Sequence, residues 1–481
     1  MLSLSFLPLD LTCSASKFEL SNQNLTMLSK YLLAALAAPV SALWPTPIHL
    51  STGDKVLFVD RTVQVKYNGH EISHDTFTPP AGKTIRNKDI VHGAISRTLN
   101  TIFEQSFVPW MLRDPRSDFE PSLKCDLKKR LLKELVISHD AADANGNFKP
   151  TKESVDESYS LNVTADGQAT LHASTAAGVL HGLQTFSQLF FKHTSGSIWY
   201  TQKVPVQIQD SPKYAHRGVL LDVSRHWYEI SDIKRMVDGL SMAKMNVIHI
   251  HITDTQSWPL EIPALPRLTE FGAHAKGLTY SPEAIADLYE YAIHRGVQII
   301  MEIDMPGHVG IEKAYPGLTV AYNKRPYGYY CAQPPCGSFR LGNKNVEKFL
   351  EKLFGDLLPR IAPYSPYFHT GGDEYRANNS ILDPDLKTND VKVLQPLLQR
   401  FLDHAHGTVR KHGLTPVVWE EMALDWNATI GKDVVVQSWL GNGSVKKLAE
   451  AGRKVIDSST DYYVSTPNIY SHCPWARQVN A

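Results

Sequence analysis

Residues 246–254 read Asn-Val-Ile-His-Ile-His-Ile-Thr-Asp, a short and almost wholly apolar run that ends in threonine and aspartate. Such a run is typical of a strand buried on both faces, as in a parallel sheet covered by helices. Other runs of the same kind lie before and after it in the chain. They are residues 217–224, 297–304, 367–374, 415–422, 433–440 and 454–459.

Amphipathic segments separate these predicted strands. Ser231 is expected to cap a helix whose apolar residues, beginning at Ile233, share one face. Another predicted helix starts at Ser281-Pro282 and stops at Gly296. Polar and charged residues gather at the carboxyl end of each strand, which favours a TIM-type (β/α)8 barrel over an open doubly wound sheet. No strand pattern follows Asp461, so we expect an α/β barrel that lacks its last strand.

The residues before the barrel follow a different pattern. Strand-like runs and one predicted helix indicate a small α+β domain. The runs are 56–59, 62–67, 159–163 and 169–173, and the helix covers 174–190. Asp210-Ser211-Pro212 then interrupts the pattern. We therefore predict a leader over residues 1–42, an α+β domain over 43–210 and the barrel over 211–481.

The leader has the form of a secretion signal. Lys30 precedes the apolar run 31–40, which closes with Ser41 and Ala42, so Met27 is expected to be the true start. The run is shorter than the ~20 apolar residues of a membrane span, and no span is predicted elsewhere. A buried apolar helix is the alternative interpretation. Asn-x-Ser/Thr triplets at Asn162, Asn378, Asn427 and Asn442 agree with secretion, or with delivery to a vacuole or lysosome.

Charge and cysteine content limit the classes of partner. Lys plus Arg and Asp plus Glu both number 49, so no net charge favours nucleic acid or anionic lipid. A neutral ligand such as a sugar fits better. The five cysteines form no CxxC motif or Cys/His cluster typical of structural zinc. Cys331 and Cys336 could close a small disulfide loop. Neither a metal nor another cofactor is predicted.

The carboxyl ends of the predicted strands carry acidic and aromatic residues. In a parallel barrel these ends form the active-site face. They hold Asp222, Arg225, His251, Asp254, Asp304, His308, Asp373, Glu374, Tyr375, Trp419, Glu420, Glu421, Gln437, Ser438 and Trp439. Glycoside hydrolysis needs an acid that protonates the leaving oxygen and aromatic faces that pack on the sugar. Neighbours in a strand point to opposite faces, so the adjacent pair Asp373 and Glu374 can converge only if Gly371-Gly372 turns the strand into a loop.

A metal site is the rival interpretation of this face. His249 and His251 alternate along one strand, so both imidazoles could bind one metal, as in metal-dependent barrel hydrolases. Such a site needs ligands from later strands, and residues 415–422 and 433–440 offer no histidine or lysine. We favour one buried, hydrogen-bonded histidine and one that orients the site.

In these residues the chain resembles glycoside hydrolase family 20, the β-N-acetylhexosaminidases, and above all its fungal secreted branch. Four stretches carry most of the resemblance: residues 216–226, 246–254, 304–308 (Asp-Met-Pro-Gly-His) and 369–374 (His-Thr-Gly-Gly-Asp-Glu). It implies a chitobiase-like domain before a catalytic barrel. It also implies retaining, substrate-assisted hydrolysis of terminal N-acetylhexosamine from amino-sugar oligosaccharides, without an enzyme nucleophile. A homodimer is left open.

The resemblance also implies the roles of single residues. Glu374 matches the general acid and base, and Asp373 matches the residue that orients the substrate's acetamido group. Arg225 is similar to the arginine that holds the O3 and O4 hydroxyls of the sugar. A bridge between carboxylates at the barrel rim is the structural alternative for Arg225.

Further positions match supporting residues of the family. Trp419 and Trp439 resemble walls of the acetamido pocket, although outer packing between helices and strands would also explain them. Asp254 and His308 match a pair that sets the protonation of the acid, and His251 is expected to support them. A buried structural pair is the alternative for Asp254 and His308.

The resemblance ends near the carboxyl terminus. Neither an eighth strand nor the family's later tryptophan and acidic residue can be placed, and Tyr463 is a candidate for the tyrosine that bonds the acetamido oxygen. Val464-Ser465-Thr466 can be encoded by a splice-donor sequence, which predicts that the tail is translated intron. An incomplete barrel leaves two open edges. A catalytically impaired, truncated sugar-binding protein is therefore the alternative function.

Overall fold

The computed structural model describes most of the chain that follows the predicted leader. The described residues are 43–79, 84–105, 108, 120–123, 130–152, 154–441 and 443–459, with the backbone alone at 463–464 and 477–479. The predicted leader over residues 1–42 and the sequon at Asn442 lie outside them. Leu43–Ala481 make up one compact unit.

An eight-stranded sheet lies in the amino-terminal part of this unit, with strand order β1-β8-β5-β6-β4-β2-β3 and β7 paired with β8. The strands are β1 (His49–Val59), β2 (Gln64–Tyr67), β3 (His70–Ile72), β4 (Glu134–His139), β5 (Tyr159–Val163), β6 (Gln168–Ala173), β7 (Phe191–Lys192) and β8 (Trp199–Asp210). The helices are α2 (Asn87–Phe103), α3 (Ala141–Ala144) and α4 (Ala176–Ser187).

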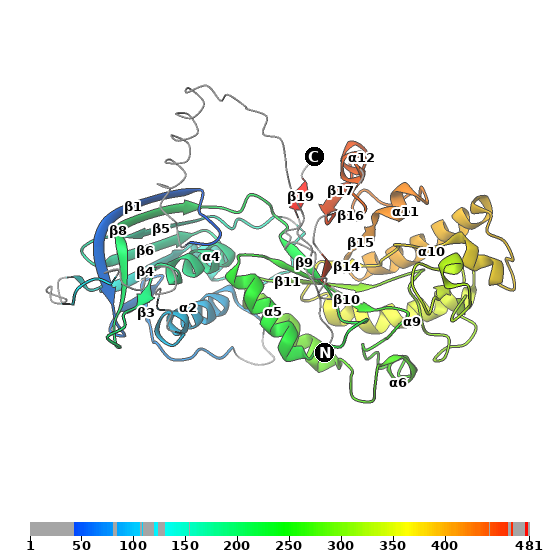
Figure 1. Cartoon of the computed structure of the whole chain (residues 1–481), viewed down its shortest axis with the longest axis horizontal. Coiled ribbons are helices and arrows are strands. Elements are labelled where there is room, and N and C mark those ends of the chain that lie inside the picture. Colours follow the sequence, from blue (N-terminus) through cyan, green and yellow to red (C-terminus); the bar gives the residue numbers. More distant parts are fainter. Residues whose placement is uncertain are drawn as a thin grey trace, which may run out of the picture. The chain divides into compact units, whose positions relative to one another are not determined.

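The buried face of this sheet packs on α2 and α4 (Figure 1). Alternate residues of β5, β6 and β8 are buried, as expected for strands with one covered face. The four predicted strands and the predicted helix are confirmed, and Thr175 caps α4 by accepting a hydrogen bond from Gly178 N at 3.2 Å. Strand β8 was not predicted, and Pro205 lies in its middle, where proline is uncommon in a strand.

A parallel sheet forms the carboxyl-terminal part, and its strands follow one another in chain order. They are β9 (Gly218–Asp222), β10 (Val247–Thr253), β11 (Gln298–Ile303), β14 (Tyr367–His369), β15 (Thr415–Trp419), β16 (Val435–Ser438) and β17 (Lys454–Asp457). Each lies within one of the seven predicted runs, so the prediction of these strands is confirmed. The strands are shorter than the runs because the polar residues at the carboxyl ends belong to loops.

Helices cover the outer face of the parallel sheet. The elements outside the seven strands are α5 (Ile230–Met242), α6 (Arg267–Gly272), α7 (Pro282–Ile293), β12 (Thr319–Val320), α8 (Tyr327–Tyr330), β13 (Ser338–Phe339), α9 (Lys344–Ile361), the 3-10 helix η3 (Ala377–Leu382), α10 (Val391–Lys411), α11 (Glu420–Leu424) and α12 (Ser444–Glu450). Helix α7 packs on β11, α10 on β15, and α12 on β16 and β17.

Two helix starts were predicted, with different outcomes. Ser281 caps α7 as expected: its hydroxyl accepts a hydrogen bond from Ala284 N at 3.2 Å, and Pro282 is the first helical residue. The predicted cap at Ser231 is wrong, because α5 begins at Ile230 and Glu229 is its N-cap. The predicted apolar face of α5 is buried at Ile233, as expected.

The carboxyl end of the sheet is only partly complete. A two-residue strand, β18 (Tyr463–Val464), pairs in parallel with β9, where the eighth strand of a barrel would begin. Strand β19 (Arg477–Val479) pairs antiparallel with β17. Among the described residues no pairing joins β17 to β18, so the barrel is not closed. The prediction of an incomplete barrel is confirmed, with the correction that two residues of an eighth strand are present.

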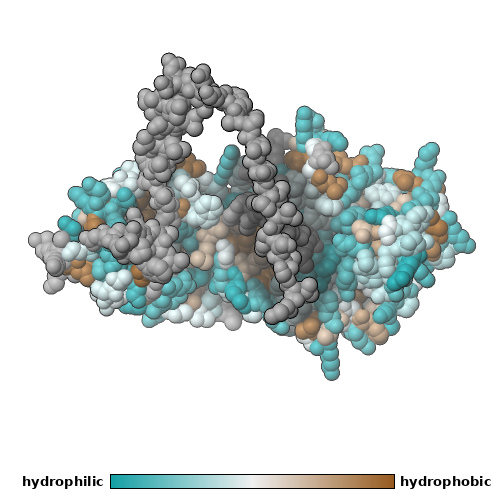
Figure 2. Space-filling view, in the orientation of Figure 1, coloured by the Kyte–Doolittle hydropathy of each residue, from teal (hydrophilic) through white to brown (hydrophobic). Residues whose placement is uncertain are grey.

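The visible surface of the described residues is mostly hydrophilic, with single apolar side chains scattered over it (Figure 2). Exposed examples are Trp44, Met242, Phe271 and Val391. Within the described part of the chain, no helix is long and apolar enough to cross a membrane.

Candidate active site

The carboxyl ends of β9 to β16 bring the predicted site residues together. Asp222 ends β9 and Trp419 ends β15. The loops that follow β10, β11 and β14 carry Asp254, His308 and the pair Asp373–Glu374. These residues come from separate strands, yet their side chains form one continuous network of contacts.

Asp373 and Glu374 converge because the chain leaves the strand geometry before it reaches them. Gly371, Gly372 and Glu374 have φ values of +66°, +106° and +52°, in the left-handed region. A Cβ on Gly371 would lie 1.8 Å from the Asp304 carboxylate, so this position requires glycine. His308 Nε2 lies 3.4 Å from Glu374 Oε2 and 3.8 Å from Asp373 Oδ2. The two carboxylates therefore lie beside the same imidazole.

Asp304 is a buried carboxyl group that interacts with Asp373 and with the glycine turn before it. Its Oδ1 accepts a hydrogen bond from Gly372 N at 2.8 Å, which holds the glycine turn in place. Burial, and then the charge of Asp373, raise the pKa of Asp304 well above its ordinary value. A protonated Asp304 can donate a hydrogen bond to the neighbouring carboxylate. This arrangement leaves Asp373 as the acceptor for a ligand.

His308 and Asp254 stand behind Glu374. His308 Nδ1 lies 3.2 Å from both carboxylate oxygens of Asp254. Burial lowers the pKa of His308, but the charges of Asp254 and Asp373 outweigh it and raise that pKa well above its usual value. The pKa of Asp254 lies well below its usual value because the charge of His308 and hydrogen bonds from the histidines outweigh burial. The two form a buried ion pair whose cation faces Glu374.

Arg225 spans the rim of the site. Its Nη1 donates to Asp222 Oδ2, and its Nη2 lies beside Asp254 Oδ2, both at 2.7 Å. Its outward partners are two neutral amides, Gln256 Oε1 and Gln333 Oε1, each at 3.1 Å. The bridge between carboxylates is therefore present. The amide oxygens lie where hydroxyl oxygens of a sugar could replace them.

The two tryptophans line the interior of the site. Trp419 is 6% exposed and packs against Leu220 and Trp439. The Trp439 indole donates to Glu421 Oε1 at 2.9 Å. Both indoles thus lie at the carboxyl-end face of the sheet. They do not pack between the strands and the outer helices, which was the alternative interpretation.

Comparison of the sequence with known protein families identifies the family to which this chain belongs. A model of the glycosyl hydrolase family 20 catalytic domain matches residues 214–474, more than half of the chain. The chain belongs to glycosyl hydrolase family 20. A second family model, described as β-acetyl hexosaminidase like, matches residues 43–189. As a member of family 20 the chain is a glycosidase.

Relatives of the family 20 chain include fungal proteins. It is 34% identical over 465 residues to a β-hexosaminidase of Arthroderma benhamiae, covering 89% of this chain and 76% of that protein. It is 31% identical to a chitooligosaccharidolytic β-N-acetylglucosaminidase of Ostrinia furnacalis, covering 70% and 59%. The Flavobacterium johnsoniae chitobiase structure matches with a TM-score of 0.66 and 28% identity, covering 86% of this chain and 58% of that one. The resemblance to family 20 and its fungal members is confirmed.

Three site residues of this family 20 chain were not predicted to take part, namely Glu302, Glu421 and Gln333. Glu302 lies inside β11 and not at its end, and the analysis of strand ends does not reach it. A glutamate within an apolar buried strand is nevertheless a signal, because a buried carboxylate needs partners. Glu421 was noted only as a strand-end residue. Burial, and then the charge of Asp373, raise its pKa to about 8.

The disulfide Cys331–Cys336 is present and closes the loop that carries Gln333. It thereby places the loop against Arg225, which the sequence did not indicate. Asn162 and Asn427 are exposed, whereas Asn378 is half-buried and donates to Tyr329 O at 3.3 Å. Only the backbone of Tyr463 is described, opposite Leu220 of β9.

The rival metal interpretation is weakened by hydrogen bonds. His249, Glu302 and His369 offer ligand atoms within 4.8 Å of one another, so a third candidate ligand does come from β14. However, His369 Nδ1 accepts a hydrogen bond from Gly371 N at 2.9 Å. Glu302 Oε1 accepts from Trp419 Nε1 at 2.7 Å. N–H groups thus occupy one possible ligand atom of His369 and one of Glu302.

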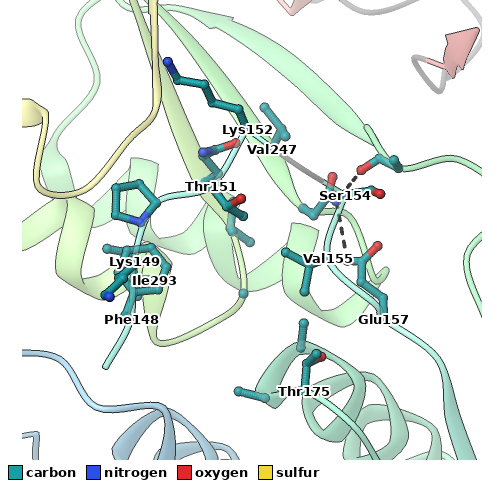
Figure 3. A pocket seen from close by; sticks show the side chains of 18 of the residues that line it. Phe148, Lys149, Thr151, Lys152, Ser154, Val155, Glu157, Thr175, Val247 and Ile293 are labelled. Carbon is teal, nitrogen blue, oxygen red and sulfur yellow. Dashed lines mark hydrogen bonds between the residues drawn. The ribbon is translucent and has the colours of Figure 1, made fainter. Parts of the chain in front are cut away.

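A separate pocket of about 540 Å³ lies at the opposite, amino-terminal ends of the barrel strands. Val247 at the start of β10 and the segment carrying Phe148, Lys149 and Thr151 line it (Figure 3). The carboxylate pair Asp373–Glu374 is not part of its wall. The candidate active site is therefore the carboxyl-end cluster and not this pocket.

Proposed function

We propose that the chain hydrolyses terminal non-reducing N-acetyl-D-hexosamine residues from β-N-acetylhexosaminides by a retaining, substrate-assisted mechanism. The observation that carries the proposal is the convergence of Asp373 and Glu374 on His308, at 3.8 and 3.4 Å. The β-hexosaminidase names of the relatives support the substrate class.

In the first step, the acetamido carbonyl oxygen of the substrate attacks the anomeric carbon. The glycosidic C–O bond breaks, its electron pair stays on the leaving oxygen, and Glu374 supplies the proton. Asp373 accepts the acetamido N–H and stabilises the positive charge of the oxazolinium ion. Proton transfer by a positioned acid typically contributes about 10²–10⁴-fold.

In the second step, water attacks the anomeric carbon from the face that the leaving group vacated. The Glu374 carboxylate takes the water proton, and the electron pair of the ring bond returns to the acetamido oxygen. Two displacements at the same carbon retain its configuration. His308, held by Asp254, places a cation beside Glu374 that stabilises its carboxylate form.

The remaining site residues bind the sugar in this proposal. Arg225 exchanges its amide partners Gln256 and Gln333 for sugar hydroxyls. Trp419 and Trp439 enclose the acetamido methyl group, since aromatic faces exclude water from apolar groups. Tyr463 is a proposed partner of the acetamido oxygen.

The biological setting is also proposed. We infer secretion from the predicted leader and the exposed sequons at Asn162 and Asn427. We take residues 43–210 as the chitobiase-like domain and 211–481 as the catalytic domain. The homodimer stays a prediction that light scattering of the purified chain would decide.

Hydrolysis of a chromogenic N-acetyl-β-D-glucosaminide tests the proposed function. Glu374→Gln and Asp373→Asn should each lower kcat at least about 10²-fold, whereas the exposed control Glu450→Gln should not. NMR of the first product should show the β-anomer. An α-anomeric first product, or full turnover in both variants, would overturn the proposal.

A second candidate function has support from the open ends of the barrel sheet at β18 and β19, which are not paired with each other among the described residues. An open barrel favours a catalytically impaired protein that binds amino sugars. Saturable binding of N-acetylglucosamine without turnover of the chromogenic substrate would support this candidate over the first.

A further inference from the structure

We propose that Glu302 is a positioning residue that couples Trp419 in the sugar pocket to the general acid Glu374 through a continuous chain of contacts. The inference rests on the proposed function and deepens it. It adds a carboxylate from the barrel interior to the site, together with a specific role for His251.

Both oxygens of Glu302 are engaged inside the barrel. The side chain is fully buried. Its Oε1 accepts the indole N–H of Trp419 at 2.7 Å. Its Oε2 lies 2.9 Å from His251 Nδ1 and 2.8 Å from His249 Nε2. One carboxylate thus contacts both the pocket wall and the histidine pair on β10.

The chain continues from His251 to the acid in three contacts. His251 Nε2 lies 2.9 Å from Asp254 Oδ2. Asp254 Oδ1 lies 3.2 Å from His308 Nδ1, and His308 Nε2 lies 3.4 Å from Glu374 Oε2. Each imidazole uses both ring nitrogens, so a shift at one end must rotate or displace the next ring.

Charges alternate along this chain. The pKa of Glu302 lies well below its usual value because its interactions with His369, His251 and His249 outweigh burial. The pKa of His251 lies well above its usual value because Glu302 and Asp254 outweigh burial. His251 is therefore a cation between two carboxylates.

The groups around both ends of the chain are also charged or titratable. His249 and His251 on β10 and His369 on β14 face Glu302, and Asp304 directly follows its strand. Arg225 lies 3.2 Å from His251 Nε2 (Nη1), 3.4 Å from His308 Nδ1 and 2.7 Å from Asp254 Oδ2 (Nη2), and the charge of Asp222 also acts on His251. At the other end, Glu374 faces His308 and neighbours Asp373, which in turn lies near Glu421 of α11. None of these groups replaces Glu302 as the acceptor of the Trp419 indole.

Neutralising Glu302 should raise the pH at which Glu374 loses its proton. Glu302→Gln removes the largest of the charges that keep His251 protonated, and we expect His251 in this variant to lose its proton even though Asp254 remains. Along the chain of contacts, the positive end of this ion pair is one contact nearer to the acid than the negative end. Its loss makes the potential at Glu374 more negative and favours the protonated acid, by about half a pH unit for effective dielectric constants near 20.

The first experiment is the pH profile of kcat/KM for the chromogenic substrate. The basic limb is the alkaline side of this profile, where kcat/KM falls as pH rises. Glu302→Gln should shift this limb to higher pH by about half a unit and should lower kcat about tenfold. Trp419→Phe should raise KM and move the limb the same way. Because Trp419 acts through Glu302, the double variant should show the same limb as Glu302→Gln alone.

Glu420→Gln is the matched control. Glu420 is 1% exposed and accepts the backbone N–H groups of Trp439 and Leu440 at 2.9 and 2.6 Å, on the same rim. It should lower stability without moving the basic limb. A limb that shifts equally in Glu420→Gln, or not at all in Glu302→Gln, overturns the coupling.

A second measurement does not depend on catalytic activity, and it is valid even if the variant is less stable than the wild type. The imidazole 15N shifts of histidine-labelled protein should report His251 as doubly protonated at pH 7 in the wild type and neutral in Glu302→Gln. Glu302→Asp, which keeps the charge, should retain the cation. A neutral His251 in the wild type contradicts the inference.

The two proposals fail in distinguishable ways. Suppose that the wild type hydrolyses the substrate and that Glu374→Gln abolishes this activity, but that the basic limb of Glu302→Gln is the same as that of the wild type. In that case only the coupling is wrong. If no N-acetylhexosaminide is turned over, the proposed function fails. The histidine shifts still decide the coupling in that case.

Discussion

Replacement of Glu421 by glutamine should change how the stability of the protein depends on pH. Glu421 is 6% exposed at the start of α11, and its Oε1 accepts the Trp439 indole N–H at 2.9 Å. Its Oε2 is buried and, among the described residues, has no hydrogen-bond partner. Burial and the charge of Asp373 raise its pKa from 4.5 to about 8.

The sign follows from proton binding. Between pH 4.5 and about 8 the folded protein keeps a proton on Glu421 that the unfolded chain has released. The unfolded state binds fewer protons, so the free energy of unfolding falls as pH rises through this window. One pH unit corresponds to about 1.4 kcal/mol, which gives an upper limit of about 5 kcal/mol. Local relaxation and water penetration reduce it, and we expect about 2–3 kcal/mol.

Glutamine keeps the acceptor for Trp439 but cannot ionise. Glu421→Gln should therefore match the wild type at pH 4.5 and melt at a higher temperature at pH 8, with a difference that grows between the two. Differential scanning fluorimetry over this range measures it, and Glu450→Gln on the surface is the matched control. Parallel pH dependences for Glu421→Gln and the wild type would refute the reasoning.

Three other changes test the site. Gly371→Ala should lower kcat at least about 10²-fold, because a Cβ would collide with Asp304 and φ is +66°; activity near the wild-type rate would contradict the glycine turn. Gln333→Ala should lower KM about tenfold with kcat unchanged, since one hydrogen bond from a charged donor, of about 1.5 kcal/mol, no longer competes for Arg225; a raised KM would mean that Gln333 helps to bind the sugar. Extended dialysis against a chelator should leave the turnover rate unchanged, and a loss restored by zinc would revive the metal interpretation of His249 and Glu302.

Local sequence patterns predicted the elements of the barrel well. The seven apolar runs each contain a strand, because burial on both faces leaves a continuous apolar signature. Ser281-Pro282 marked the start of α7 because its capping bond spans only three residues. Ser231 failed as a cap because a serine close to a helix start can also lie inside the first turn.

Part of the site could be predicted in the same way. Asp373 and Glu374 belong to a short sequence motif, and Gly371-Gly372 directly before them predict a turn. The structure adds that His308 faces both carboxylates. It also corrects the expectation that no eighth strand begins, since Tyr463 and Val464 pair with β9.

The sequence by itself determined which segments are the seven main strands of the barrel, where their polar ends lie and that an acid pair follows β14. Only the tertiary structure decided that Glu302 contacts Trp419, 117 residues away, and that Gln333 reaches Arg225 across 108 residues. Periodicity and capping report interactions between residues close in the chain. The partners of a buried carboxylate come from neighbouring strands, and that pairing is fixed only when the sheet curls and brings their side chains into one interior.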